Sequence, residues 1–354
     1  MNTLIVASTR PYAGKSGICL SLLGMLADRS VRAGYFKPYG TMPVTVDGVL
    51  TDQDAAYIAG KAPVRPPIES VCPVVETPHV VEDLIAGRSG DAQGLVRSAY
   101  RAASEHADAM VVEGTSELAQ GATFGIHLCA MAELLDARVL LVDRPEHVSV
   151  PDPVIWASEC LGQRLIGVVF NAVPEQLIRF AQSDVATYLS GRGITTFGVL
   201  EHDPLLSSVS VAEIVDSLGA TVLSAEGNLD VPVESFMVGA MGQEKALRFF
   251  RRKARKAVIT GGDRADVQLA ALETDTRCIV LTGNLPPSGI VLSRAEELGV
   301  PMLLVESDTL STVEAMEGLL GRVRLHDPVK AARMREMFET AVDTDALMAA
   351  AYGL

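Results

Sequence analysis

The sequence contains no long apolar segment, although its mean hydropathy is positive at +0.26. A helix that spans a membrane needs about 20 consecutive apolar residues. The longest apolar run, residues 18–27, reaches about half that length and is interrupted by Ser21 and Gly24. Residues 1–8 also lack the basic start of a signal peptide. We therefore expect neither a membrane-spanning nor a secreted protein.

Paired cysteines are also missing. The cysteines number five, are scattered along the chain and form no C-x-x-C motif. Such a set is typical of buried thiols in a reducing compartment rather than of a disulfide framework. We therefore predict a cytoplasmic protein with free thiols at Cys19, Cys72, Cys129, Cys160 and Cys278.

Basic residues are too few for a protein that binds nucleic acid along its surface. Acidic residues number 44 and basic residues 30, which gives a formal net charge of −14. This charge repels a polyanion, but a few local groups can still hold a phosphorylated small molecule. The basic cluster at residues 251–256 is typical of a solvated helix face, and a site for an anionic ligand or an acidic partner is the alternative. The histidines show no zinc-ligand spacing, and no Gly-x-Ser-x-Gly elbow or catalytic cysteine is found.

Short, β-branched apolar runs alternate with helix-like stretches along the whole sequence. Runs that are almost continuously apolar are expected for strands buried on both faces. The stretches between them, such as 92–106 and 124–135, carry apolar residues at three- and four-residue spacing. This alternation predicts an α/β fold with a doubly wound, mostly parallel sheet. The strands predicted in the first half are Thr3–Ala7, Gly34–Lys37, Ala109–Glu113, Val139–Asp143, Leu165–Asn171 and Thr195–Leu200.

The length of 354 residues allows two domains, since a domain takes about 150 residues. We predict a first domain at 1–205, a smaller α/β domain at 206–325 and a helical tail with frayed last residues at 326–354. The second domain is predicted to contain strands at 257–260, 278–282 and 302–305 and helices at 266–273, 293–298 and 310–320.

The segment Leu4–Gly17 carries the strongest functional signal. It places Gly-Lys-Ser between a buried strand and a long apolar helix. That context predicts a phosphate-binding loop, in which backbone N–H groups and a helix N-terminus converge on phosphate oxygens. The usual pattern has a glycine where this chain has Thr9, and an ordinary turn with a surface lysine is the alternative. The predicted loop residues are Thr9, Arg10, Ala13, Gly14, Lys15, Ser16 and Gly17, with Lys15 on the β- and γ-phosphates and Ser16 on Mg²⁺.

Charged residues elsewhere would complete a nucleotide site. Glu113 ends a buried strand, at the sheet edge where α/β proteins bind ligands, and is predicted to hold Mg²⁺ directly or through water. Asp54 precedes a helical stretch and is either a helix N-cap or a site residue. Lys37 ends another strand and forms either a salt bridge or a ligand contact. Arg10 either contacts phosphate, within one chain or across a dimer, or faces solvent.

These residues resemble the dethiobiotin-synthetase-like P-loop domain over residues 1–205. In that family the loop glycine lies one place earlier than usual, where this chain has Ser8. The resemblance implies a P-loop NTPase fold with ATP and Mg²⁺ as cofactors. It assigns Lys15 and Lys37 as catalytic lysines, Ser16, Asp54 and Glu113 as the metal set, and Asn171 as the residue that reads adenine.

One segment departs from that family. After Glu113-Gly114 the family has a small Ala-Gly-Gly stretch that approaches its diamino acid substrate, whereas this chain has Thr115-Ser116-Glu117-Leu118. The replacement is bulkier and more negative. It argues against carboxylation of a biotin precursor.

The second domain resembles the DRTGG domain, through Met237–Met241, Ile259–Asp266 and Leu281–Gly283. The order of the two domains is similar to the N-terminal regulatory half of long bacterial phosphate acetyltransferases. The acyl-transfer domain that follows in those enzymes has no counterpart here, so we expect no phosphate acetyltransferase activity from this chain alone. Kinship of the DRTGG domain with nucleotide-sensing modules implies an adenine nucleotide or a partner surface, and a turn fixed by an Asp263–Arg264 pair is the alternative.

Together the motifs predict a cytoplasmic, homo-oligomeric protein that binds Mg–ATP and regulates acyl-CoA or acyl-phosphate metabolism, with slow or no ATP turnover. An enzyme of acetate metabolism is the expected partner. The first alternative is an ATP-dependent ligase that activates a carboxylate or carbamate, and the second is a pseudo-NTPase scaffold. The sequence leaves open the second substrate or effector and the ligand of the second domain.

Overall fold

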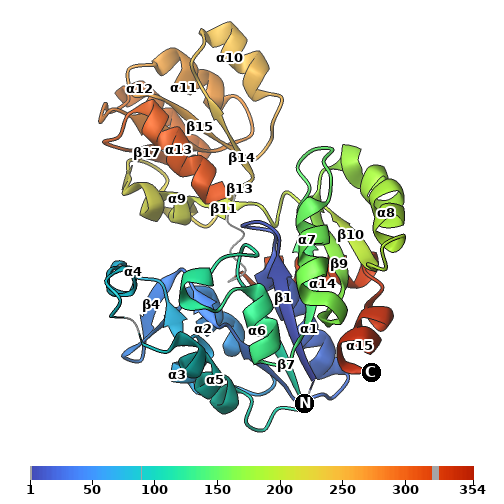
Figure 1. The fold of residues 1–354 in the computed structure, drawn as a ribbon. Coiled ribbons are helices and arrows are strands. Elements are labelled where there is room, and N and C mark those ends of the chain that lie inside the picture. The colour runs from blue at the N-terminus through green and yellow to red at the C-terminus, as the bar shows by residue number, and fades with distance from the viewer. Residues whose placement is uncertain (1, 89, 321–326) are drawn as a thin grey trace. The chain divides into compact units, whose positions relative to one another are not determined.

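The chain forms two compact units in the structure, a computed structural model that describes residues 2–88, 90–320 and 327–354. The first unit contains the residues up to His202 together with Leu325–Leu354. The second unit is Asp203–Arg324. Each unit has its own sheet and its own core (Figure 1). The second unit is thus an insertion between two parts of the first.

The first unit is built on a six-stranded parallel sheet with the strand order β10-β9-β8-β1-β7-β2. Every strand predicted there is found, with ends shifted by at most two residues. The predicted doubly wound α/β fold is therefore confirmed. The strands are β1 (Asn2–Ser8), β2 (Ala33–Phe36), β7 (Ala109–Glu113), β8 (Arg138–Asp143), β9 (Leu165–Val173) and β10 (Thr196–Glu201).

Helices cover both faces of this sheet, as the continuous apolar character of its strands requires. One face packs against α1 (Lys15–Asp28), α14 (Pro328–Ala341) and α15 (Thr344–Tyr352). The other face packs against α5 (Ala92–Ala103), α6 (Leu128–Leu134), α7 (Asp152–Leu161) and α8 (Ala186–Ser190). Smaller elements of the unit are β3 (Tyr39–Gly40), β4 (Pro43–Val46), β5 (Val49–Asp52), α2 (Gln53–Ala59), α3 (Ile68–Val71), β6 (Val74–Val75) and α4 (Pro78–Ile85).

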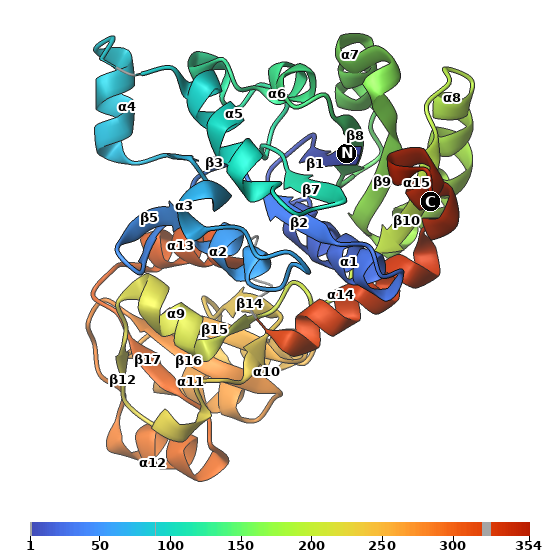
Figure 2. The same cartoon turned by 90° about the horizontal axis from the view of Figure 1, so that it is seen from below.

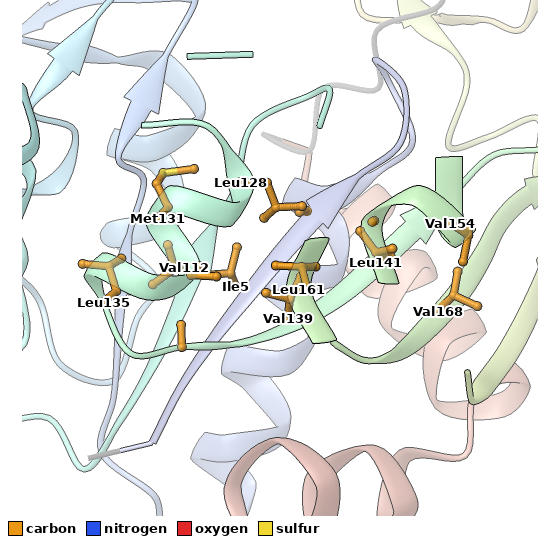
Figure 3. Packing of buried hydrophobic residues seen from close by; sticks show 14 of the residues in the cluster. Ile5, Val112, Leu128, Met131, Leu135, Val139, Leu141, Val154, Leu161 and Val168 are labelled. Carbon is orange, nitrogen blue, oxygen red and sulfur yellow. The ribbon is translucent and has the colours of Figure 1, made fainter. Parts of the chain in front are cut away.

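The core between the sheet and the helices α5 to α8 shows how side chains of one strand are divided between the two faces of the sheet. Side chains alternate between the faces of a strand, so Ile5 of β1 points toward α6, whereas its neighbours Leu4 and Val6 face the other layer. Figure 3 shows Ile5 and Val112 beside Leu128 of α6 in this cluster. All of these side chains are fully buried. The central strand is thereby fixed from both sides, which holds its carboxyl end in place.

The C-terminal segment is ordered and packs on the first unit. Figure 2 shows α14 lying side by side with α1, and Phe338 and Tyr352 of the two last helices are buried. The Asn2 side chain donates a hydrogen bond to the carbonyl of Tyr352 at 2.5 Å. The expectation of frayed last residues is therefore wrong, because an apolar face of α15 covers β1 and β10.

The strand order identifies where a ligand is expected in the first unit. From β1 the chain first passes to the edge strand β2, returns to β7 beside β1, and then crosses to β8 on the other side of β1 before it continues outward to β10. Open α/β sheets bind ligands outside the carboxyl ends of the strands at such a point of reversal. The carboxyl end of β1, with those of β7 and β8 beside it, is therefore the candidate site.

The second unit contains a five-stranded sheet with the order β12-β17-β16-β15-β14. Only the edge strand β12 is antiparallel. The parallel strands follow chain order, so this sheet has no point of reversal. Its strands are β12 (Thr221–Val222), β14 (Ser235–Val238), β15 (Lys256–Gly261), β16 (Thr276–Thr282) and β17 (Met302–Leu304); β11 (Val209–Ser210) and β13 (Pro232–Val233) form a separate pair. Its helices are α9 (Val211–Leu218), α10 (Gln243–Phe250), α11 (Ala265–Leu272), α12 (Gly289–Leu298) and α13 (Thr309–Leu320).

Two local expectations for the second unit are corrected. The basic cluster follows α10 as a turn instead of lying on a helix face, and Lys256 is fully buried at the start of β15. Arg264 pairs with Asp266 at 3.1 Å rather than with Asp263, because its guanidinium turns along α11 and also donates to the Met241 carbonyl at 2.9 Å.

The cysteine expectation is wrong for two of the five residues. The structure joins Cys129 of α6 to Cys160 of α7 in a disulfide, whereas Cys19, Cys72 and Cys278 are free and buried. Packing of α6 beside α7 brings the two Cα atoms to 6.4 Å, a separation that no sequence motif encodes. Among the described residues, no helix combines the length and apolar character that crossing a membrane requires.

Candidate nucleotide site

The candidate phosphate-binding loop connects β1 with the N-terminus of α1. Gly14 caps that helix with φ of +88°, in the left-handed region that glycine tolerates. A Cβ atom at Gly14 would lie 2.2 Å from Nδ2 of Asn171. That same Nδ2 donates to the carbonyl of Ala13 at 2.8 Å. Asn171, near the carboxyl end of β9, therefore stabilises the loop through this hydrogen bond. Its recognition of adenine stays a prediction.

The loop lysine is turned back onto its own loop. Lys15 is buried, and its Nζ donates to Ser8 Oγ at 2.9 Å and to Ser116 Oγ at 3.4 Å. Burial lowers the pKa of Lys15 to about 8, with nearby Glu113 acting in the opposite direction. The ammonium thus rests on neutral hydroxyls, so its charge is left for an anionic ligand.

Ser8 occupies the position where the resembled family has glycine, and its hydroxyl is fully used. Besides accepting from Lys15, Ser8 Oγ lies 2.9 Å from the Arg10 carbonyl and 2.8 Å from the Ser116 carbonyl. The side chain thereby ties the loop to the segment after β7.

Ser16 and Glu113 lie together at the first turn of α1. Ser16 Oγ donates to Glu113 Oε1 at 3.0 Å, and the Tyr35 hydroxyl donates to Glu113 Oε2 at 2.8 Å. Burial, followed by the Glu113 charge, raises the pKa of Tyr35 well above its ordinary value, so the phenol stays a donor. Both carboxylate oxygens of Glu113 therefore have fixed directions.

Lys37 lies between two carboxylates. Its Nζ is 2.8 Å from Asp52 Oδ1 and 3.4 Å from Glu113 Oε1. Burial alone would lower the pKa of Lys37, but Glu113, Asp52 and Asp54 outweigh burial and raise it above the ordinary value. Lys37 is therefore a permanent cation next to the loop.

Asp52, not Asp54, caps the helix that follows. Asp52 is the N-cap of α2 and accepts from the backbone N–H of Ala55 at 3.0 Å. Asp54 lies in the first turn of α2, is half-buried, and raises the pKa values of both Lys15 and Lys37 through its charge. The N-cap interpretation thus belongs to the residue two positions earlier, and Asp54 lies close to both lysines.

Thr9 and Arg10 contact the opposite side of the loop. Thr9 Oγ1 donates to Asp143, and Arg10 Nε lies 3.5 Å from Asp143 Oδ1. The Arg10 side chain is only about one-third exposed. The alternative of a solvent-facing arginine therefore does not hold. Asp143 ends β8 and is buried, which makes it an anchor for the loop.

The oxygen-bearing side chains beside Ser16 and the two lysines fit the chemistry of Mg²⁺. Ser16, Glu113 and Asp54 supply a hydroxyl and carboxylates, which are the hard oxygen ligands of this ion. Within the described part of the chain, no group of three or more His, Cys, Asp or Glu residues forms a metal cage. Mg²⁺ in nucleotide sites is held by one or two carboxylates plus the phosphates, so this donor set suits a cation that arrives with a nucleotide.

The sequence predictions missed four residues of this cluster: Tyr35, Asp52, Ser116 and Asp143. Asp143 carries the same signal as Glu113, an acidic residue that ends a buried strand. Asp52 carries the same signal as Asp54, an acidic residue before a helix. No comparable pattern marks Tyr35 or Ser116.

Comparison with known families gives two matches. Residues 2–210 match the AAA domain family, and residues 213–319 match the DRTGG domain family. The two matches confirm the resemblance to a dethiobiotin-synthetase-like P-loop domain followed by a DRTGG domain.

Curated relatives include phosphate acetyltransferases. That of Synechocystis sp. is 24% identical over 378 residues, covering 98% of this chain and 51% of the relative. That of Pseudomonas aeruginosa is 24% identical over 378 residues, covering 97% and 51%. The chain spans about half the length of the curated relatives it matches.

Solved structures with some similarity include a signal recognition particle receptor from Elizabethkingia anophelis in complex with GDP, with a TM-score of 0.35, 10% identity and 56% of each chain covered. A regulatory region of Clostridium perfringens pyrophosphatase, containing CBS and DRTGG domains with diadenosine tetraphosphate, has a TM-score of 0.30 and 17% identity, and covers 43% of this chain and 74% of that one.

Proposed function

This chain belongs to the AAA domain family, and on that premise we propose that it binds Mg–ATP and regulates an enzyme of acyl-CoA or acyl-phosphate metabolism. The observation that carries nucleotide binding is the convergence of Lys15, Ser16, Lys37, Asp54 and Glu113 at the carboxyl edge of the sheet. Lys15 and Lys37 supply two positive charges at this edge, although the whole chain is acidic.

Each group has a role in this proposal. Lys15 leaves its two hydroxyl partners for the β- and γ-phosphates, and the N–H groups at the start of α1 bind the same oxygens. Mg²⁺, when bound, neutralises phosphate charge, and Ser16, Asp54 and Glu113 would hold it. Asn171 reads adenine.

The regulatory part of the proposal is supported by the relatives. Phosphate acetyltransferases align with nearly all of this chain through about half of their own length. The proposal extends to a homo-oligomer in the cytoplasm and to a partner enzyme of acetate metabolism. It includes an adenine nucleotide or a partner surface as the ligand of the second unit.

Calorimetric titration of the full chain with ATP and Mg²⁺ tests nucleotide binding. Lys15→Ala should abolish the binding heat, whereas Lys61→Ala, which removes an exposed lysine of the same unit, should leave the affinity unchanged. ADP release should be slow in the absence of a partner. A wild-type chain with no affinity for Mg–ATP supports the scaffold alternative and contradicts the proposal.

An ATP-dependent ligase is the second candidate. It is favoured by the two buried lysines beside the loop, which would stabilise a phosphoryl group during transfer to a carboxylate or carbamate. A screen of carboxylic acids separates the two functions. Rapid ADP release stimulated by one acid supports the ligase, and uniformly slow release supports the regulator.

A further inference from the structure

Asp52 makes more contacts than a helix cap requires. The carboxylate is fully buried. Oδ2 accepts from the backbone N–H groups of Thr41 at 3.1 Å and Met42 at 3.0 Å. Oδ1 accepts from the N–H of Ala55 at 3.0 Å and from Lys37 Nζ at 2.8 Å. Four donors thus fix the direction of both oxygens.

The backbone around Asp52 leaves it no room to move. A Cβ atom added to Gly40 would lie 2.5 Å from the Asp52 Cβ and 2.9 Å from its Oδ2. A glycine at position 40 is therefore needed for this close approach. The carboxylate is a fixed point between the segment after β2 and the start of α2.

The position of Lys37 matters because its second neighbour is a proposed metal ligand. Glu113 Oε1 accepts from Ser16 at 3.0 Å and lies 3.4 Å from Lys37 Nζ. Mg²⁺ and the ammonium would compete for that oxygen, since both are attracted to the same negative charge. Lys37 pairs with both carboxylates, but Asp52 is the nearer one at 2.8 Å, so it draws the ammonium toward itself and leaves Glu113 the longer contact of 3.4 Å.

We propose that Asp52 is a positioning residue that limits the contact of the Lys37 ammonium with Glu113 and thereby keeps Glu113 available to the Mg²⁺ of a bound nucleotide. This inference rests on the proposed Mg–nucleotide site. Asp52 itself touches neither the nucleotide nor the metal. It acts through the position of Lys37.

The test measures how strongly Mg²⁺ improves nucleotide affinity. The full chain is titrated with the non-hydrolysable analogue adenylyl imidodiphosphate, at Mg²⁺ concentrations from zero upward, by calorimetry. The variants are Asp52→Ser, Lys37→Gln and the double variant. Serine retains a side-chain acceptor for the helix cap while it removes the charge. Asp91→Ser is the matched control, because Asp91 caps α5 through Gly94 in the same way, outside the cluster.

Asp52→Ser should raise the Mg²⁺ concentration for half-maximal effect about tenfold, because Lys37 then pairs with Glu113. Removing the lysine as well should bring that concentration back to within about twofold of the value for Lys37→Gln alone, a non-additive result expected only of coupled groups. The Asp91→Ser control should not change it. Equal Mg²⁺ dependence in Asp52→Ser and wild type, or no restoration in the double variant, overturns the assignment.

Lys37→Gln alone keeps the test decisive if the Asp52 variants fold poorly. With Asp52 in place the longer Lys37–Glu113 contact competes only weakly with Mg²⁺, so removal of the lysine should weaken nucleotide affinity almost equally with and without Mg²⁺. A several-fold lower Mg²⁺ requirement in Lys37→Gln would overturn the proposal, since it would mean that Lys37 already occupies Glu113.

The melting temperature separates this inference from the proposed function. A wild-type chain that binds no nucleotide contradicts the function. The Asp52–Lys37 pair is then judged from the four Tm values without ligand: the losses for the two single variants should not sum to that of the double variant. Additive Tm losses overturn the pairing itself.

Discussion

Among single residues, Gly14 is held by two constraints that can be separated. Its φ of +88° disfavours any side chain, and Asn171 occupies the place of its Cβ. Gly48 has a similar φ of +81° but nothing within 4 Å. Comparing the two glycines isolates the contribution of Asn171.

We expect Gly48→Ala to lower the free energy of unfolding by about 1 kcal/mol, the cost of a left-handed alanine. Gly14→Ala should cost about 1–3 kcal/mol more and should weaken nucleotide binding, because Asn171 must release the Ala13 carbonyl. Urea unfolding and calorimetry measure both effects. Equal losses from the two substitutions would show that Asn171 can move away from position 14 without a loss of stability.

Lys256 gives a residue-level prediction for the second unit. Its Nζ donates to Thr274 Oγ1 and to the Asp275 carbonyl, both at 3.0 Å. Burial lowers the pKa of Lys256 from 10.5 to about 8, although the Asp275 charge opposes this. Between those two pH values the unfolded chain binds the extra proton, so stability should rise as pH rises through this window.

The measurement compares wild type with Lys256→Met, which lacks the titrating group. The free energy of unfolding of the second unit in wild type, minus that in Lys256→Met, should increase by about 1 kcal/mol between pH 7.5 and pH 9.5. Lys253→Met, at an exposed position in the same turn, should show no pH-dependent difference. A flat difference for Lys256→Met would contradict the lowered pKa.

At the scale of elements, α14 packs on α1 and β10 of the first unit although it follows the second unit in the sequence. Phe338 is fully buried in this helix, whereas Val329 in its first turn is 61% exposed. Phe338→Ala should lower the free energy of unfolding of the first unit by about 3–5 kcal/mol. Val329→Ala should change it by no more than about 0.5 kcal/mol. Urea denaturation followed by circular dichroism measures both, and similar effects would contradict the packing of α14.

The strands of the first unit were predictable because burial on both faces leaves a continuous apolar run in the sequence. The return of α14 and α15 to that unit was not, since hydrophobic periodicity is local and does not say which sheet a helix covers. The same limit applies to the Cys129–Cys160 disulfide, which depends on how two helices pack.

The candidate site shows a finer version of this limit. Lys15, Ser16 and Glu113 follow from a loop pattern and a strand end, and the structure places them together. The sequence does not show which of Asp52 and Asp54 caps the helix, because an aspartate at either position can do so. Only the three-dimensional position of Lys37 distinguishes them.

For the whole molecule, two units with separate cores predict two unfolding transitions. Mg–ATP bound at the loop should shift the transition of the first unit by about 2.7 kcal/mol at a concentration 100 times Kd. Phe338→Ala should lower that same transition, which identifies it independently of the ligand. A single transition that responds to both changes would show that the units unfold together. Fluorescence of the single tryptophan, Trp156 of α7, reports on the first unit alone.

The insertion of the second unit also sets an order of events on the ribosome. The strands of the first sheet emerge before the second unit, but α14 and α15, which cover one of its faces, emerge after it. The second unit is contiguous and can close its core while the first still exposes apolar surface along α1 and β1. The unit that is begun first is therefore finished last, and during synthesis of the insertion the nascent chain carries a sheet face that only α1 covers in part.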